Sequence, residues 1–221
     1  MIDIESLGFR YPGAEFALSI PRFHVNHGEK VAVIGPSGSG KTTLLSLVAG
    51  IRVPQQGRVR SAGVEISALN DRARREFRIG NVGLVFQEFE LLDYLDVLDN
   101  ILLPYRISRA LRLTREVRER AAELARRLAI GDKLRRGIDQ LSQGERQRVC
   151  ICRALLPWPK LVLADEATGN LDPHNKEHIL ELLFDAVDAH DATLLAVTHD
   201  HELLPHFDRV IDFADFRAET T

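Results

Sequence analysis

One glycine-rich segment of the sequence has the residue types and spacing that phosphate binding needs. GPSGSGKTT, residues 35–43, satisfies the pattern G-x-x-x-x-G-K-[ST] between the apolar run KVAVI and a helical run. The glycines let consecutive backbone N–H groups curl around phosphate oxygens, and Lys41 adds a point charge between the β- and γ-phosphates. The Thr42 hydroxyl can complete a Mg²⁺ shell, the helix N-terminus adds its dipole, and Thr43 can reach the α-phosphate. The predicted phosphate contacts are Gly35, Pro36, Ser37, Gly38, Ser39, Gly40, Lys41, Thr42 and Thr43.

Polar residues that follow other apolar runs complete this chemistry. Asp165 and Glu166 end the run LVLADE, where Asp165 is the expected Mg²⁺ partner and Glu166 can act as a general base on water. His199 follows the run LLAVT, at the sheet edge where open α/β sheets bind ligands, and can hold the γ-phosphate and the water. Gln87 follows NVGLVF and is placed to touch Mg²⁺ or the water. The predicted catalytic residues are Lys41, Glu166 and His199, and the predicted Mg²⁺ ligands are Thr42, Gln87 and Asp165.

A parallel sheet is required to bring these strand ends together. Continuous apolar runs predict buried strands at 30–34, 81–86, 161–165, 193–198 and 209–213, and alternating runs predict strands at 2–8, 16–25 and 57–67. Helical patterns cover 42–49, 97–103, 115–128 and 173–189. We therefore predict an α/β fold, a P-loop NTPase core with an N-terminal antiparallel β subdomain and an inserted α-helical subdomain. The whole chain, 1–221, forms one domain, with the core and β subdomain at 1–86 and 157–221 and the helical insertion at 87–156.

Composition limits the remaining possibilities. The chain has 221 residues, 45% of them hydrophobic, and a net charge of −3 with acidic residues interleaved among the arginines, so nucleic acid is not an expected partner. Cys150 and Cys152 lack a second pair to complete a zinc site and are expected to be buried. His174 and His178 have metal-ligand spacing on a helix, but a solvated face is the preferred interpretation. There is no signal peptide pattern and no apolar run of eighteen residues, so we expect a cytoplasmic chain without a membrane span.

The segment LSQGERQR, residues 141–148, begins a helix in an unusual way. Ser142 and Glu145 have the spacing of a capping box. Capping leaves Gly144 unexplained, because glycine inside a helix costs about 1 kcal/mol against alanine. A glycine in the first turn permits close approach to backbone N–H groups, which attract anions. The segment predicts a second phosphate site.

Taken in order and spacing, GPSGSGKTT, Gln87, LSQGERQR, LVLADE, ATGNLD and His199 resemble the ATP-binding-cassette ATPases over essentially the whole chain. The resemblance implies ATP and Mg²⁺ as cofactors and a head-to-tail homodimer that sandwiches two ATP molecules. It implies that Ser142, Gln143, Gly144 and Glu145 act on the ATP of the second copy. Tyr11 would stack on adenine, and the loop Asn170, Leu171 and Asp172 would cross the dimer interface. Two residues depart from the family pattern: Gln143 stands where glycine is usual, and Ala167 where the subgroup usually has proline.

Within that family, LVLADE with TGNLD resembles the group of lipoprotein-releasing, macrolide-export, glycolipid-export and cell-division ATPases. The group implies a cytoplasmic ATPase that sits on the inner face of the cell membrane through a separate integral-membrane permease, and an exporting or lipid-extruding output. Mechanical signalling is the alternative output, and a soluble ATP switch, an inactive scaffold and a P-loop kinase are alternative classes. The helical insertion would dock the partner, and Phe89, Leu91, Leu92 and Leu95 are either that contact or internal core.

Overall fold

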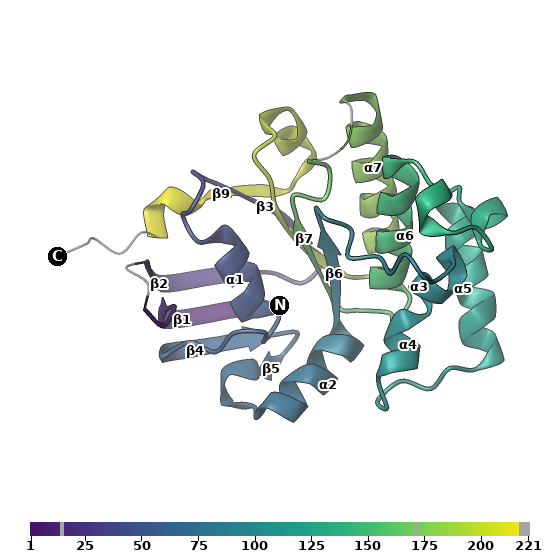
Figure 1. Cartoon of the computed structure of the whole chain (residues 1–221). Coiled ribbons are helices and arrows are strands. Elements are labelled where there is room, and N and C mark those ends of the chain that lie inside the picture. The colour runs from purple at the N-terminus through teal and green to yellow at the C-terminus, as the bar shows by residue number, and fades with distance from the viewer. Residues whose placement is uncertain (14–15, 170, 172, 217–221) are drawn as a thin grey trace.

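The first layer of the molecule is an antiparallel sheet near the N-terminus. The computed structural model describes residues 1–13, 16–169, 171 and 173–216 (Figure 1). The sheet has the strand order β2-β1-β4-β5, with long antiparallel pairing of β1 to β2 and β4. Its strands are β1 (Ile2–Arg10), β2 (Ala17–Val25), β4 (Gln56–Ser61) and β5 (Val64–Glu65). The antiparallel β region expected at the N-terminus is therefore present.

The central layer is a parallel sheet with the strand order β6-β7-β8-β3-β9. Its strands are β3 (Lys30–Ile34), β6 (Val82–Phe86), β7 (Leu161–Asp165), β8 (Thr193–Val197) and β9 (Arg209–Asp212). Alternate side chains of β7 enter different cores: Leu161 and Leu163 pack with the antiparallel sheet, Val162 and Ala164 with the helices. Burial on both faces explains why this strand is continuously apolar. The fold class predicted from sequence is confirmed.

Helices cover the two faces of the parallel sheet unequally. In Figure 1, α1 (Lys41–Val48) and α2 (Asp71–Asn81) lie on the side of the antiparallel sheet. The other side carries α3 (Val97–Ile101), α4 (Leu103–Ile107), α5 (Arg115–Arg127), α6 (Gln143–Leu155) and α7 (Pro173–Ala189). Short 3-10 helices span Ile66–Ala68, Gly131–Lys133, Ile138–Gln140, His201–His206 and Phe213–Phe216. Because α6 packs on both β6 and α7, the segment LSQGERQR, residues 141–148, which we call the signature segment, belongs to the helical side.

Two predicted elements are wrong in detail. The run 57–67 is not one strand, because Ala62 and Gly63 adopt positive φ values of 48° and 80° and reverse the chain between β4 and β5. The run 97–103 is the start of two short helices that meet at Leu102, with Pro104 in the first turn of α4. In both cases the apolar pattern persists through a change of backbone direction.

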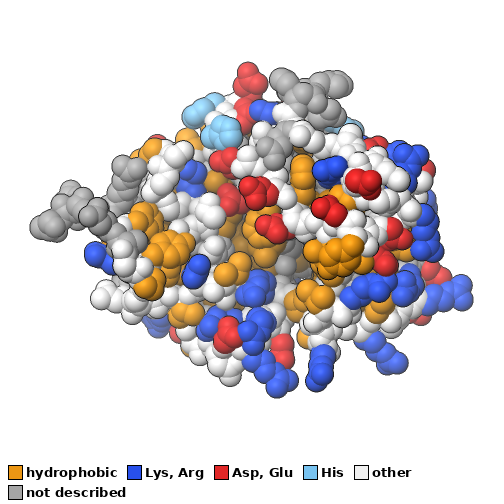
Figure 2. All heavy atoms as spheres, viewed as in Figure 1, with side chains coloured by type: hydrophobic (Ala, Val, Ile, Leu, Met, Phe, Trp, Pro, Cys, Tyr) orange, Lys and Arg blue, Asp and Glu red, His pale blue; other side chains and the backbone are white. Residues whose placement is uncertain are grey.

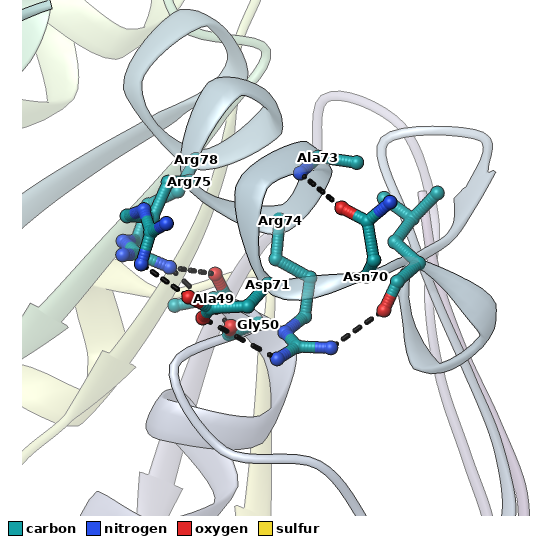
Figure 3. Close-up of polar contacts among 9 residues, drawn as sticks. Ala49, Gly50, Asn70, Asp71, Ala73, Arg74, Arg75 and Arg78 are labelled. Carbon is teal, nitrogen blue, oxygen red and sulfur yellow. Dashed lines mark hydrogen bonds and ion pairs between the residues drawn. The ribbon is translucent and has the colours of Figure 1, made fainter.

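Helix α2 is absent from the sequence-based prediction. Phe77 is its only residue that the structure describes as buried, so the apolar periodicity that reveals other helices is missing. Its ends carry the signals instead: Asn70 accepts a hydrogen bond from the Ala73 N–H at 2.9 Å, and Arg75 pairs with Asp71 one turn earlier (Figure 3). Arg78 donates to the carbonyl of Gly50 at 3.3 Å, which ties α2 to the end of α1 (Figure 3).

The remaining composition-based expectations concern cysteine, histidine and membrane spans. Cys150 and Cys152 are free and fully buried, as predicted. His178 is exposed, while the side chain of His174 lies outside the described part of the chain. Within the described ranges, no group of three or more His, Cys, Asp or Glu side chains could hold a metal ion. None of the described helices is both long enough and apolar enough to cross a membrane.

Candidate nucleotide-binding site

The glycine-rich loop joins the carboxyl end of β3 to the first turn of α1. Gly40 caps α1 with φ 103°, and a Cβ atom there would lie 2.9 Å from Cζ of Phe16, so only glycine fits. The Lys41 ammonium donates to the carbonyl oxygens of Gly35 at 2.8 Å and Pro36 at 2.9 Å. These bonds hold the lysine inside the curl of the loop, where only 9% of the residue is exposed.

A cavity of about 600 Å³ opens over this loop. Its size is typical of a small-molecule site. The cavity is lined by Tyr11, Phe16, Ser37, Gly38, Gly40, Lys41, Thr42, Thr43, Glu166 and Val197. Ser39 is instead buried, and its hydroxyl has no hydrogen-bond partner among the described residues. The structure thus brings Tyr11, most of the predicted loop contacts and Glu166 to one cavity.

Glu166 and His199 meet at the carboxyl edge of the parallel sheet. Glu166 has φ 48°, a conformation that is costly for a residue other than glycine, and its N–H donates to the Val197 carbonyl at 2.9 Å. Its carboxylate lies 3.2 Å from Nδ1 of His199, whose side chain is 63% exposed. The N–H of Thr198 donates to the carbonyl of Val33 at 3.2 Å, which fixes His199 near the start of the phosphate loop. The two residues can therefore face one water molecule together.

A second cavity, of about 300 Å³, adjoins the first at the ends of β6 and β7. It is lined by Thr42, Phe86, Gln87, Glu88, Glu90, Asp165 and Glu166. Acidic side chains gather near the middle of the face drawn in Figure 2, by the tip of β6. Burial raises the pKa of Asp165 above its ordinary value and the Glu166 charge adds to the rise, while the Thr42 hydroxyl and Lys41 lower it. Hydroxyl, amide and carboxylate oxygens are the ligands that Mg²⁺ prefers, so the donor set fits this ion.

Tyr11 is held at the rim of the larger cavity by its neighbours. Its hydroxyl lies 3.2 Å from Oγ1 of Thr43, and Phe9 packs against its ring edge to face at 4.9 Å. The guanidinium of Arg52 lies 5.3 Å from the ring centroid. A planar base stacked on Tyr11 would share the ring with this cation.

The signature segment begins α6 with the predicted capping box. The N–H of Glu145 donates to the Ser142 hydroxyl at 3.3 Å, and the Ser142 N–H donates to the Glu145 carboxylate at 2.8 Å. Partial burial of Glu145 opposes the lowering of its pKa, but the Ser142 bonds and the Lys133 ammonium outweigh it. Ser142 and Gln143 are exposed. None of residues 142–145 lines the phosphate cavity described above.

The predicted interface loop lies only partly within the residues that the structure describes. Leu171 is 8% exposed and packs into the helical core, while Asn170 and Asp172 lie outside the described residues. Phe89, Leu91, Leu92 and Leu95 are partly buried, and Leu91 packs against the helical core.

Phe16, Arg52 and Gly169 are among the residues at the site that sequence reasoning missed. Phe16 lines the phosphate cavity and contacts the loop at Gly40, and Arg52 lies over Tyr11. A Cβ at Gly169 would lie 3.1 Å from the Gln87 side-chain amide, so this glycine permits the amide's close approach. The ATGNLD motif contained the signal for Gly169. Phe16 and Arg52 had none, because only tertiary packing brings Phe16 to the loop and Arg52 to Tyr11.

A groove of about 570 Å³ runs between α2 and α4. Its floor is apolar and includes Val82, Leu84, Phe86, Leu103 and Ile107, and its rim includes Arg72, Arg75, Arg78, Arg109 and Arg153. Lys and Arg side chains gather along the lower edge of the face in Figure 2, over α2 and towards α4. Ile107 is 69% exposed. An apolar surface of this kind with a cationic rim is typical of an interaction site.

A phosphate loop, two acids and a histidine at the edge of a parallel sheet define a P-loop nucleotide hydrolase. The sequence matches the family described as ABC transporter over residues 18–169. It is 40% identical over 214 residues to the lipoprotein-releasing system ATP-binding protein LolD of Pseudomonas fluorescens, covering 96% of this chain and 93% of the relative. It is also 42% identical to the macrolide export ATP-binding/permease protein MacB of Rhodopirellula baltica, covering 87% of this chain and 28% of that longer protein. The chain belongs to the ABC transporter family and is an ATP-binding ATPase subunit of that family.

Solved structures agree with this assignment. The dimeric structure of MJ0796, a bacterial ABC transporter cassette, has a TM-score of 0.84 and 31% identity, covering 96% of this chain and 94% of the other. A dimeric post-hydrolysis structure of the same cassette, bound to ADP and Pi, also has a TM-score of 0.84, with 30% identity over 98% of this chain and 94% of the other.

Proposed function

We propose that the chain binds ATP between two copies arranged head to tail and uses hydrolysis to drive a separate integral-membrane subunit of the lipoprotein-releasing type. One observation carries the dimer: residues 142–145 do not line the chain's own phosphate cavity, yet Ser142 and Gln143 are exposed at a capped helix N-terminus. A helix N-terminus attracts anions. A second copy can bring that terminus to the phosphates, and the similar cassette MJ0796 is described as a dimer.

The proposed reaction uses the chain's residues in separate roles. Lys41 and the loop N–H groups stabilise negative charge on the phosphates, and Ser142 and Gly144 of the second copy close over the γ-phosphate. Glu166 orients the attacking water and accepts its proton. His199, whose Nδ1 lies 3.2 Å from the Glu166 carboxylate, holds the γ-phosphate. Thr42, Gln87 and Asp165 would hold Mg²⁺, which neutralises phosphate charge when bound. Tyr11 would stack on adenine.

The groove between α2 and α4 is the proposed seat of the membrane subunit. Its apolar floor suits the apolar face of a short helix, and it lies beside Gln87 through Phe86 and Glu90, which line both the groove and the smaller acidic cavity. A segment seated in the groove would contact Phe86, which immediately precedes the proposed Mg²⁺ ligand Gln87 in the chain. Through this partner the ATPase would sit at the inner face of the cell membrane. The relatives named as lipoprotein-releasing ATPases support this type of partner, with export or extrusion as the output.

The dimer is tested with Glu166→Gln. Replacing the carboxylate with an amide removes the base but keeps the shape of the side chain, so ATP binds without being hydrolysed. We expect this variant to elute as a dimer with ATP and Mg²⁺ and as a monomer with ADP in size exclusion with light scattering. A Glu166→Gln/Lys41→Ala double variant is the control. It lacks the ammonium that stabilises the phosphate charge, so it should stay monomeric with ATP. A Glu166→Gln chain that stays monomeric with ATP would falsify the sandwich.

A further inference from the structure

The loop that follows Gln87 is fastened to helix α6 by side chains of that helix. Arg153 donates from Nη2 to the carbonyl oxygen of Phe89 at 2.7 Å, and from Nη1 to the carbonyl oxygen of Glu90. The thiol of Cys150 donates to the same Phe89 oxygen at 3.0 Å. Burial raises the pKa of this thiol to about 12, so it keeps the proton that it donates. Two side chains on one face of α6 thus hold two consecutive carbonyl groups.

The carbonyls that receive these bonds belong to residues in a costly conformation. Phe89 has φ 57° and Glu90 has φ 51°, both in the left-handed region that residues other than glycine rarely adopt. Such a conformation persists where the surroundings over-determine it. The guanidinium and the thiol supply that constraint, so the shape of the loop depends on where α6 lies.

The same arginine lies in the proposed partner groove. Arg153 and Ala154 line it together with Phe86 and Glu90, which flank residues 87–89. A segment seated in the groove would therefore contact Arg153. We call Arg153 and Cys150, the two side chains of α6 that bond to the loop, the clamp. Of these two residues, only Arg153 also lines the groove.

Helix α6 connects this clamp to the signature residues. Its C-terminal end is seated on β6, since a Cβ at Gly83 would lie 2.7 Å from the carbonyl oxygen of Ala154. Its N-terminal end is the exposed capping box at Ser142. A helix of 13 residues is about 20 Å long. A small rotation about the seat at Gly83 therefore displaces the signature end by more than it displaces the clamp.

We propose that Arg153, assisted by Cys150, is a positioning residue that sets the signature end of α6 according to the state of the groove and the loop after Gln87. The inference rests on the proposed function, because the signature end matters only if it acts on the ATP of a second copy. Occupation of the groove presses on Arg153 and Glu90, the clamp carries that displacement into α6, and the helix delivers Ser142 and Gly144 to the other copy.

The test compares variants that remove donors one at a time. Arg153→Ala removes both guanidinium donors, Arg153→Lys keeps the charge but reaches one carbonyl, and Cys150→Ala removes the thiol. Cys150→Ser restores a donor and serves as the conservative rescue. Arg126→Ala is the matched control, since Arg126 is an α5 surface arginine paired with Glu123. Each variant is assayed for kcat, KM and the affinity of the monomer for a fluorescent ATP analogue.

We expect Arg153→Ala to lower kcat by about tenfold or more while monomer ATP affinity stays within about twofold, because the phosphate loop does not depend on the clamp. Arg153→Lys should fall between Arg153→Ala and the wild type, Cys150→Ala should lower kcat by a smaller factor that Cys150→Ser recovers, and Arg126→Ala should match the wild type. Unchanged kcat in Arg153→Ala overturns the proposal, as does an equal loss of ATP affinity. If Arg153→Ala does not fold, the Lys and Cys150 series decides.

Hydrogen exchange separates this inference from the dimer itself. With Arg153→Ala, amide exchange should rise both in residues 88–92 and in residues 142–146, across the length of α6. A rise confined to 88–92 marks a purely local role and sinks the clamp proposal even if the dimer forms. The Glu166→Gln chain could fail to dimerise with ATP while Arg153→Ala still raises amide exchange in both segments. In that case the head-to-tail dimer is wrong, but the coupling of the loop to the signature end through α6 is right.

Discussion

At the scale of single residues, the carboxylate of Asp165 is buried at some cost to the stability of the fold. Burial is the main cause of its raised pKa, and the adjacent Glu166 carboxylate adds to it. The ionised form is therefore less stable in the folded chain than in the unfolded chain. A group whose pKa is raised by folding destabilises the fold above its folded pKa and contributes nothing below its unfolded value.

Asp165→Asn is predicted to stabilise the protein in the absence of nucleotide and Mg²⁺. The gain in the free energy of unfolding should be largest near neutral pH and should shrink as the pH falls towards the ordinary value of 3.8, by about 1.4 kcal/mol for each unit of pKa shift. Urea unfolding measured between pH 4 and pH 7 checks it. ATPase activity should fall in the same variant, because a proposed Mg²⁺ ligand is lost.

Asp200→Asn is the control with the opposite sign. The Lys176 ammonium, 2.7 Å away, holds the pKa of Asp200 below its ordinary value, so its charge stabilises the fold above the unfolded pKa. Asp200→Asn should therefore destabilise the protein at neutral pH, and that cost should fade as the pH falls through the folded pKa. If Asp165→Asn destabilises the protein at neutral pH as Asp200→Asn does, the burial argument for Asp165 fails.

At the scale of elements, helix caps stand in for missing apolar periodicity. Asn70 caps α2 with a bond of 2.9 Å, whereas Thr114 caps α5 with a longer bond of 3.4 Å. Helix α5 has a buried apolar stripe of Val117, Ala121, Leu124 and Ala125, but α2 buries only Phe77 among its described residues. Helix α2 must rely more on its ends.

Asn70→Ala is predicted to lower the free energy of unfolding by about 1 kcal/mol, since the Ala73 N–H loses its acceptor. Asn70→Asp keeps an acceptor and should be close to neutral. Thr114→Ala should cost less than Asn70→Ala because its bond is longer and its helix is better packed. Denaturant midpoints of the three variants rank them, and a larger loss at Thr114 would contradict this account of α2.

At the scale of the whole molecule, the proposed active site is divided between two copies. Lys41→Ala disables the phosphate loop. Gly144→Asp places a negative charge where the phosphate of the other copy would approach. The helix itself tolerates this substitution, because an acidic residue in the first turn interacts favourably with the helix dipole. Each variant alone should lack ATPase activity. In an equal mixture, half of the dimers pair unlike chains and contain one intact site of two, so activity should return to about a quarter of the wild-type rate.

Phosphate release from the mixture, compared with each variant alone, measures this complementation. Mixing Lys41→Ala with a Lys41→Ala/Gly144→Asp double variant supplies no intact phosphate loop and should stay at background. A mixture of the two single variants that also stays at background counts against a site shared head to tail.

The sequence by itself determined the family, the fold class and the residues around the phosphate loop. Each motif is local: a glycine pattern after a buried strand, acids after an apolar run, and a capping box can each be read within ten residues of chain. The family and the fold class follow from the order of these motifs and elements along the chain. The predicted roles of Glu166, His199, Gln87 and the signature residues remain predictions, as does the division of the chain at 87–156.

Only the tertiary structure decided which distant residues share a surface. It placed Phe16 at the phosphate loop and Arg52 over the Tyr11 ring, seated α6 on Gly83, and brought the Arg153 guanidinium to the Phe89 and Glu90 carbonyls. These contacts join residues up to 71 positions apart, from Gly83 to Ala154, and no local pattern encodes them. Hydrophobic periodicity specifies which face of an element is buried. The packing of whole elements specifies which other element that face contacts, and the groove and the clamp arise from this packing.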